Sequence, residues 1–128
     1  MDYQQSRAYI RDAEQYAGGA LDVTNIKEIM KRLGNPQDQL KYVHVAGTNG
    51  KGSVIAYLYT TLTNAGYHVG RYISPSVYSY REKIEVEGTP ISREQFAKHT
   101  TRVAAVIEEM TAEGLAHPTP FEIETAVA

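Results

Sequence analysis

A glycine-rich segment with one lysine carries the chemistry that this sequence indicates most clearly. Residues 42–54 read Tyr-Val-His-Val-Ala-Gly-Thr-Asn-Gly-Lys-Gly-Ser-Val, and a helical pattern follows. Glycines allow the backbone to take positive φ and to approach a ligand closely, as we expect at Gly47, Gly50 and Gly52. Backbone N–H groups of such a loop, and of the first turn of the next helix, can bind phosphate oxygens. Lys51 adds a compact positive charge that can reach the outer phosphates, so the segment predicts a polyphosphate site.

The spacing of this segment departs from the general phosphate-loop pattern G-x-x-x-x-G-K-[ST]. Val45 stands at the place of the first glycine, and Gly52 stands where a hydroxyl residue should follow the lysine. The alternative is a plain glycine-rich turn, but the lysine and the strand–loop–helix context coincide, which favours phosphate binding. The residues expected to contact a nucleotide are Gly47, Thr48, Asn49, Gly50, Lys51, Gly52 and Ser53.

The run from Gly47 to Ser53, preceded by His44-Val-Ala, resembles the folylpolyglutamate synthase / dihydrofolate synthase family of Mur-ligase-like ATP-dependent amide-forming enzymes. Four more segments resemble the family in the same order along the chain: Leu33-Gly-Asn-Pro-Gln37, Tyr72-Ile-Ser-Pro75, Arg81-Glu-Lys-Ile84 and Pro120-Phe-Glu-Ile-Glu-Thr-Ala126. In the third of these segments, Lys83 stands where the family usually has an arginine.

The resemblance implies a ligase that adds L-glutamate to folates, to dihydropteroate, or to both, through an acyl phosphate. It implies ATP and Mg²⁺ as cofactors, Lys51 as the catalytic residue, and Ser74 and Glu122 as Mg²⁺ ligands. Each ligand also has a structural interpretation that stays open. Ser74 precedes a proline in a turn, and Glu122 can form a capping box with Thr119.

Other side chains near Ser74 could contact a substrate. Tyr72, Tyr78 and Tyr80 could stack on a pterin ring, although tyrosines occur throughout this chain. Arg81 and Lys83 could meet an anionic substrate.

Three other functions remain as alternatives. A peptidoglycan-precursor ligase shares the architecture but usually has two hydroxyl residues after the lysine, whereas this chain has Gly52-Ser53. A nucleotide kinase would be expected to keep the standard loop spacing. A non-catalytic nucleotide-binding fragment is the third.

The composition narrows the class of protein. The net charge of the 128 residues is -2, which suggests neither a nucleic-acid nor a membrane partner. There is no cysteine, which excludes disulfides and thiolate chemistry, and no apolar run approaches the ~18–20 residues that span a bilayer. This composition fits a cytoplasmic enzyme, and the resemblance implies small-molecule substrates and a monomer at full length.

Family members have two domains and several hundred residues. Residues 1–128 are therefore expected to be an incomplete N-terminal part of the ATP-binding domain, without the C-terminal domain and inactive alone.

Periodicity and turn residues predict a truncated α/β domain. Two strands joined by the helix after the loop should be parallel, which indicates a P-loop-type three-layer fold with a mostly parallel sheet. A helix that Thr24 or Asn25 caps should end at Gly34, and the first helix should end at Gly18-Gly19. The first helix is expected over 3–17, and further helices over 51–65, 93–113 and the residues from 120 onward. The expected strands span 42–46, 68–73 and 84–87.

Overall fold

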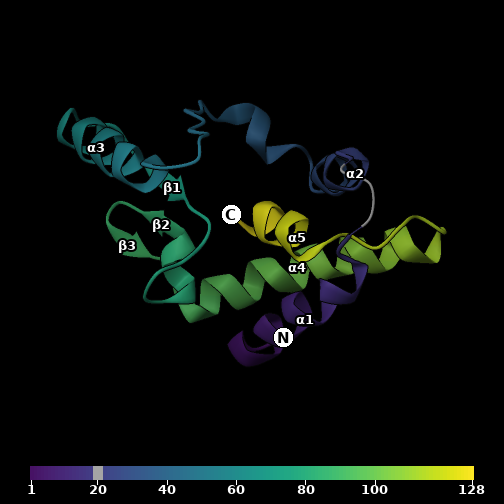
Figure 1. Cartoon of the computed structure of the whole chain (residues 1–128). Coiled ribbons are helices and arrows are strands. Elements are labelled where there is room, and N and C mark those ends of the chain that lie inside the picture. Colours follow the sequence, from purple (N-terminus) through teal and green to yellow (C-terminus); the bar gives the residue numbers. More distant parts are fainter. Residues whose placement is uncertain (19–21) are drawn as a thin grey trace. The chain divides into compact units, whose positions relative to one another are not determined.

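The structure is a computed structural model of the chain that describes residues 1–18 and 22–128 (Figure 1). Two compact units make up the chain. Unit one combines Met1–Lys41 with Arg93–Ala128, and unit two is Tyr42–Ser92.

Unit one is helical. Its α-helices are α1 (Tyr3–Asp12), α2 (Thr24–Arg32), α4 (Arg93–Ala112) and α5 (Pro120–Val127), with short 3₁₀ helices η1 (Ala13–Tyr16) and η2 (Pro36–Gln39). Both helix 3–17 and helix 93–113 are confirmed, the former with a 3₁₀ last turn.

The helix ends of unit one follow local capping chemistry. The N–H of Gln5 donates to the Asp2 carboxylate at 2.8 Å, and the Gln5 side chain accepts in return from the Asp2 N–H at 2.8 Å. The prediction that Thr24 or Asn25 caps α2 is wrong. Thr24 is the first helical residue, and its N–H and hydroxyl both donate to the Asp22 carboxylate. Gly34 has φ +87° just past α2, as expected, whereas Gly19 lies outside the described residues.

The core of unit one forms around α4 (Figure 1). Helices α1, α2 and α5 all contact α4. The buried positions of α4 recur at helical spacing, so one stripe faces its neighbours. Burying one large apolar side chain contributes about 1.5–3 kcal/mol. The largest buried apolar side chains are Phe96, Ile29, Ile107, Met110, Ile123 and Val103.

Unit two contains one α-helix and a small sheet. Its elements are α3 (Lys51–Asn64), β1 (Gly70–Tyr72), the 3₁₀ helix η3 (Tyr80–Lys83), β2 (Ile84–Val86) and β3 (Thr89–Pro90). The sheet order is β1-β2-β3 and both pairings are antiparallel, with Arg71 opposite Glu85. Glu87 (φ +51°) and Gly88 (φ +79°) make the tight turn between β2 and β3, as primed hairpin turns require.

The expected strand over 42–46, and with it the parallel pairing, is not confirmed. Tyr42 and Val43 are 67% and 66% exposed, and the segment has no regular secondary structure. A strand needs a neighbour to satisfy its backbone N–H and C=O groups, and no part of 1–18 or 22–128 pairs with this segment. β1 is also shorter than predicted and pairs with β2, because the chain turns back after Ser74.

Helix α3 forms where expected, but its apolar residues at helical spacing are not buried. Val54 is 46% exposed, Leu58 and Leu62 are half-buried, and no residue of α3 is buried. The only strand of unit two that packs closely on it is the three-residue β1, which is too small to cover a helix of 14 residues. Within the described ranges, no helix is both long and apolar enough to cross a membrane.

Candidate functional site

The glycine-rich loop leads directly into α3. Gly50 is the N-cap residue of α3 and has φ +80°, in the left-handed region that glycine adopts at low cost. Gly47 has φ +156° and starts the bend through Thr48 and Asn49. Gly52 was wrongly expected to have positive φ, because it lies inside the first turn of α3.

The N-terminus of α3 presents backbone donors. The first backbone bond of α3 runs from the Val54 N–H to the Gly50 carbonyl at 3.0 Å. The N–H groups of Lys51, Gly52 and Ser53 therefore precede the hydrogen-bonded part of the helix, and no side chain caps them. Helix N-termini carry partial positive charge, so this end of α3 suits an anion such as phosphate.

Lys51 places a full positive charge over the same loop. Its ammonium group donates to the Gly47 carbonyl oxygen at 2.6 Å, which bridges the start of the loop and the start of the helix. None of the ion pairs found among residues 1–18 and 22–128 involves Lys51. The structure thus brings all seven predicted loop residues together, with Ser53 exposed on the first helical turn.

Ser74 lies in unit two, directly after β1. The N–H of Ile73 donates to the Lys83 carbonyl at 2.9 Å, so Ser74 is the first residue beyond this closure. It is exposed, and its peptide bond to Pro75 is cis.

Glu122 lies in unit one and caps its own helix. Its Oε2 accepts from the Thr119 N–H at 2.8 Å and from the Thr119 hydroxyl at 2.9 Å. The capping-box interpretation is therefore confirmed. A hydroxyl and a carboxylate still match the hard oxygen donors that Mg²⁺ prefers, so the shared Mg²⁺ site of Ser74 and Glu122 stays a prediction. The described residues contain no group of three or more His, Cys, Asp or Glu side chains that could hold a metal ion.

Glu82 is the residue of this region that the sequence analysis missed. Its carboxylate accepts hydrogen bonds from the N–H groups of Val77, Tyr78 (2.8 Å) and Ser79 (3.2 Å). The bonds from Tyr78 and Val77 are the main reason that the pKa of this carboxyl lies below its ordinary value. Ser79-x-x-Glu82 has the form of a capping box, and that pattern could have identified Glu82.

The other side chains expected to contact substrate differ in availability. Tyr78 is 95% exposed. The Lys83 ammonium lies 4.7 Å from the Tyr80 ring centre, and the Arg81 guanidinium donates to the Ile91 carbonyl at 2.9 Å. Tyr72, Tyr80, Arg81 and Lys83 are all partly buried, so Tyr78 is the exposed member of the five.

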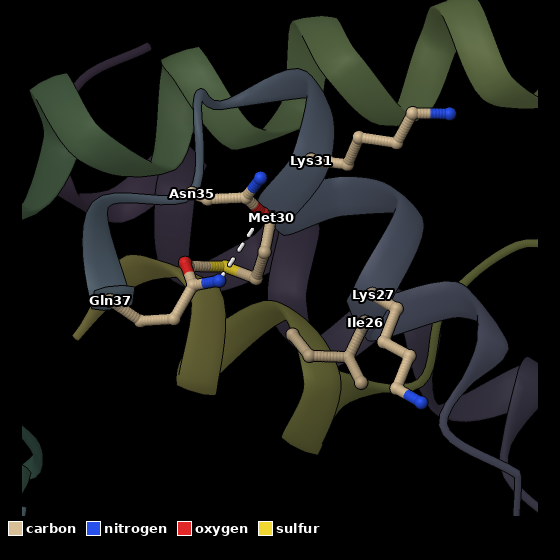
Figure 2. Close-up of a pocket in the computed structure, with 6 residues that line it drawn as sticks. All are labelled: Ile26, Lys27, Met30, Lys31, Asn35 and Gln37. Carbon is tan, nitrogen blue, oxygen red and sulfur yellow. Dashed lines mark hydrogen bonds between the residues drawn. The ribbon is translucent and has the colours of Figure 1, made fainter.

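A shallow hollow of about 460 Å³ lies on unit one, beside α2 (Figure 2). The Gln37 amide donates to the Asn35 side chain at 3.2 Å across it. Figure 2 shows the ammonium groups of Lys27 and Lys31 pointing away from this bond and from Met30, so the hollow has no converging charge.

Comparison with known proteins identifies relatives over the whole chain, although no family model matches it. The chain is 37% identical over 126 residues to a dihydrofolate synthase/folylpolyglutamate synthase of Bacillus subtilis, covering 98% of this chain and 29% of that protein. The chain thus spans less than a third of this relative's length.

Solved structures agree with the sequence comparison. Folylpolyglutamate synthetase from Lactobacillus casei superimposes with a TM-score of 0.89 at 34% identity, covering 99% of this chain and 32% of that one. An FPGS–AMPPCP–folate complex superimposes with a TM-score of 0.85 at 33% identity, covering 100% of this chain and 31% of that one. The two units therefore have the fold of the corresponding part of these proteins.

Proposed function

The chain belongs to the folylpolyglutamate synthase / dihydrofolate synthase family, and from this premise we propose that it carries the nucleotide-binding loop of an ATP-dependent ligase. The reaction is the addition of L-glutamate to folates, to dihydropteroate, or to both. The observation that carries the proposal is the loop itself: Gly50 is the N-cap residue of α3, no side chain caps the first turn of α3, and the Lys51 ammonium lies over the loop at the Gly47 carbonyl. A relative with the same fold binds AMPPCP, a non-hydrolysable ATP analogue, together with folate.

The proposed chemistry requires stabilisation of negative charge. A carboxylate oxygen of the folate or pteroate substrate attacks the γ-phosphorus of ATP, which gives an acyl phosphate and ADP. The amine of L-glutamate then attacks the acyl carbon, loses a proton and expels phosphate, so that an amide bond forms. Lys51 and the N–H groups of the loop hold the phosphate oxygens while charge shifts among them.

Ser74 and Glu122 complete the proposal as the Mg²⁺ ligands. Bound Mg²⁺ would neutralise charge on the β- and γ-phosphates. Ser74 would contribute its hydroxyl from the end of β1. Glu122 would contribute its carboxylate while keeping the capping bonds to Thr119.

The proposal extends to the fold and setting of the full-length enzyme. We propose that 42–46 forms a strand of a mostly parallel sheet there, because its exposed Tyr42 and Val43 are typical of an unpaired strand. We also propose a monomer in the cytoplasm, where ATP and L-glutamate are available, with neither nucleic acid nor membrane as partner.

An assay of phosphate release by the full-length protein tests the function. Dihydropteroate, tetrahydrofolate and peptidoglycan precursors are offered separately, each with Mg·ATP and with or without L-glutamate. We expect glutamate-dependent release with dihydropteroate, tetrahydrofolate or both. Release with peptidoglycan precursors alone would favour the rival ligase, and nucleotide binding without any release would indicate a non-catalytic protein.

A further inference from the structure

The loop between β1 and β2 is tied together at two levels. At its base, the Ile73 N–H donates to the Lys83 carbonyl at 2.9 Å, which closes the ten residues 74–83. Higher up, the N–H groups of three consecutive residues, Val77, Tyr78 and Ser79, all donate to the Glu82 carboxylate. Only the three residues 74–76 lie between Ile73, which is held by Lys83, and residues 77–79, which are held by Glu82. This short stretch begins with Ser74.

Glu82 uses both carboxylate oxygens in this arrangement. Oε1 accepts from Val77 and Tyr78, and Oε2 accepts from Ser79. Hydrogen bonds from N–H groups to an ionised carboxylate are stronger than those between neutral groups. The return bond from the Glu82 N–H to the Ser79 carbonyl at 3.1 Å holds the start of η3 in the same turn.

The segment that Glu82 holds has little other support. Val77 and Tyr78 are 77% and 95% exposed, so apolar burial does not order them. An exposed loop without such bonds would have to be ordered when a ligand binds, and that ordering lowers affinity.

We propose that Glu82 is a positioning residue of the ligase: it orders 77–79, and with them the adjoining stretch that begins at Ser74, so that the Tyr78 ring meets the substrate in one arrangement. This inference rests on the proposed function. Tyr78 then offers a flat face, on a backbone already held, to the aromatic part of the folate or pteroate substrate. Glu82 itself touches no substrate, since its carboxylate is occupied by the loop amides.

Two measurements on the full-length protein test the inference, with Glu82→Ala, Glu82→Gln and the control Glu87→Ala. Glu87 is an exposed carboxylate of the same unit, paired with His68, so the control makes the same change of charge. Hydrogen exchange of peptides that span 74–83 should accelerate at least ~10-fold in Glu82→Ala and less in Glu82→Gln, which keeps one acceptor oxygen. Exchange of peptides from β1 and β2 and the melting temperature should stay at wild-type values.

The second measurement is steady-state kinetics. We expect Glu82→Ala to lower kcat/KM for the pterin-bearing substrate at least ~10-fold, Glu82→Gln to lie between it and wild type, and Glu87→Ala to match wild type. The positioning role would be overturned if Glu82→Ala left exchange in 74–83 unchanged, or if it accelerated that exchange but kept wild-type kinetics. A lower melting temperature together with faster exchange throughout the sheet would also overturn it. Failure of the proposed function is distinguishable, because it appears as absent ligation in the wild type, before any variant is made.

Discussion

At the residue scale, the strongest functional signal is Lys51. Its ammonium lies 2.6 Å from the Gly47 carbonyl oxygen. Lys51 is also the first residue of α3, and no side chain caps this turn of the helix. A carbonyl oxygen is a weak partner for a full charge, and a phosphate group would be a stronger one. Lys51 is therefore the residue whose replacement tests the proposed nucleotide site most directly.

We expect Lys51→Ala to lower turnover of the full-length enzyme by at least ~10²-fold, because charge stabilisation at the phosphates is lost. Lys51→Arg should not restore activity, since guanidinium is larger and planar. Lys27→Ala on α2 is the matched control for loss of one lysine and should leave turnover unchanged. Steady-state rates decide, and near-wild-type turnover in Lys51→Ala would refute the phosphate-loop assignment.

Ser74 and Glu122 give a prediction about metal. If both bind Mg²⁺, Ser74→Ala and Glu122→Ala should each raise the Mg²⁺ concentration needed for half-maximal activity. The double variant should cost less than the sum of the two, because both act on one ion. Mg²⁺ titration of each variant measures this.

A purely structural Glu122 has a different signature. Glu122→Ala would then lower the free energy of unfolding by about 0.5–2 kcal/mol, as loss of a helix cap does, with Mg²⁺ dependence unchanged. Thermal unfolding alongside the Mg²⁺ titration separates the two roles.

At the element scale, Arg32 links α2 to the end of α4. Its guanidinium makes two bonds to the Glu113 carboxylate, at 3.0 and 2.6 Å, and one to Glu28 at 2.8 Å. The Arg32 side chain is 19% exposed, whereas that of Glu113 is 58% exposed, so water reaches one side of this ion pair. Bonds from Arg32 lower the pKa of both Glu28 and Glu113.

This cluster should make stability depend on pH. Because the folded-state pKa values of Glu28 and Glu113 are lowered, the stabilisation is present above their ordinary value of 4.5 and is lost as pH falls through the lowered values. Arg32→Met should therefore lower the melting temperature near pH 7, and the difference from wild type should shrink towards about pH 3. Thermal unfolding across that range checks this, and a difference independent of pH would mean that Arg32 acts through packing alone.

At the scale of the whole molecule, unit two buries far fewer apolar side chains than the described part of unit one. The exposed side chains include Tyr42, Val43, Val54 and Tyr57, of which Tyr57 is 77% exposed. Unit one, in contrast, buries its large apolar side chains around α4. Exposed apolar surface and unpaired strand-like segments favour association between molecules.

We therefore expect residues 1–128 alone to be poorly soluble or oligomeric, to bind Mg·ATP weakly at best, and to ligate nothing. Light scattering during size-exclusion chromatography, calorimetry with Mg·ATP and the phosphate-release assay are the measurements. The full-length protein is the reference in each. Glutamate ligation by a purified, monomeric 1–128 chain would contradict the expectation.

Several features within a few neighbouring residues were predictable from the sequence, although the start of α2 was not. The α3 start at Gly50-Lys51 and the Thr119–Glu122 cap were read correctly, because helix ends depend on side chains three or four positions apart. The loop composition and its neighbouring segments also indicated the family that the comparisons show.

Only the tertiary structure decided which strands pair and which surfaces are covered. Residues 42–46 have the composition of a strand, yet no strand in the described part of the chain pairs with them, and β1 pairs antiparallel with β2 instead. Val54, Leu58 and Leu62 recur at helical spacing on α3, but burial depends on a partner layer, which unit two does not supply. The sequence pattern of a capping box could identify the contact of Glu82 with Ser79, whereas its bonds from the Val77 and Tyr78 N–H groups required the folded loop. Sequence determines local backbone and capping chemistry, whereas pairing and burial depend on residues far apart in the chain, so only the folded structure settles them.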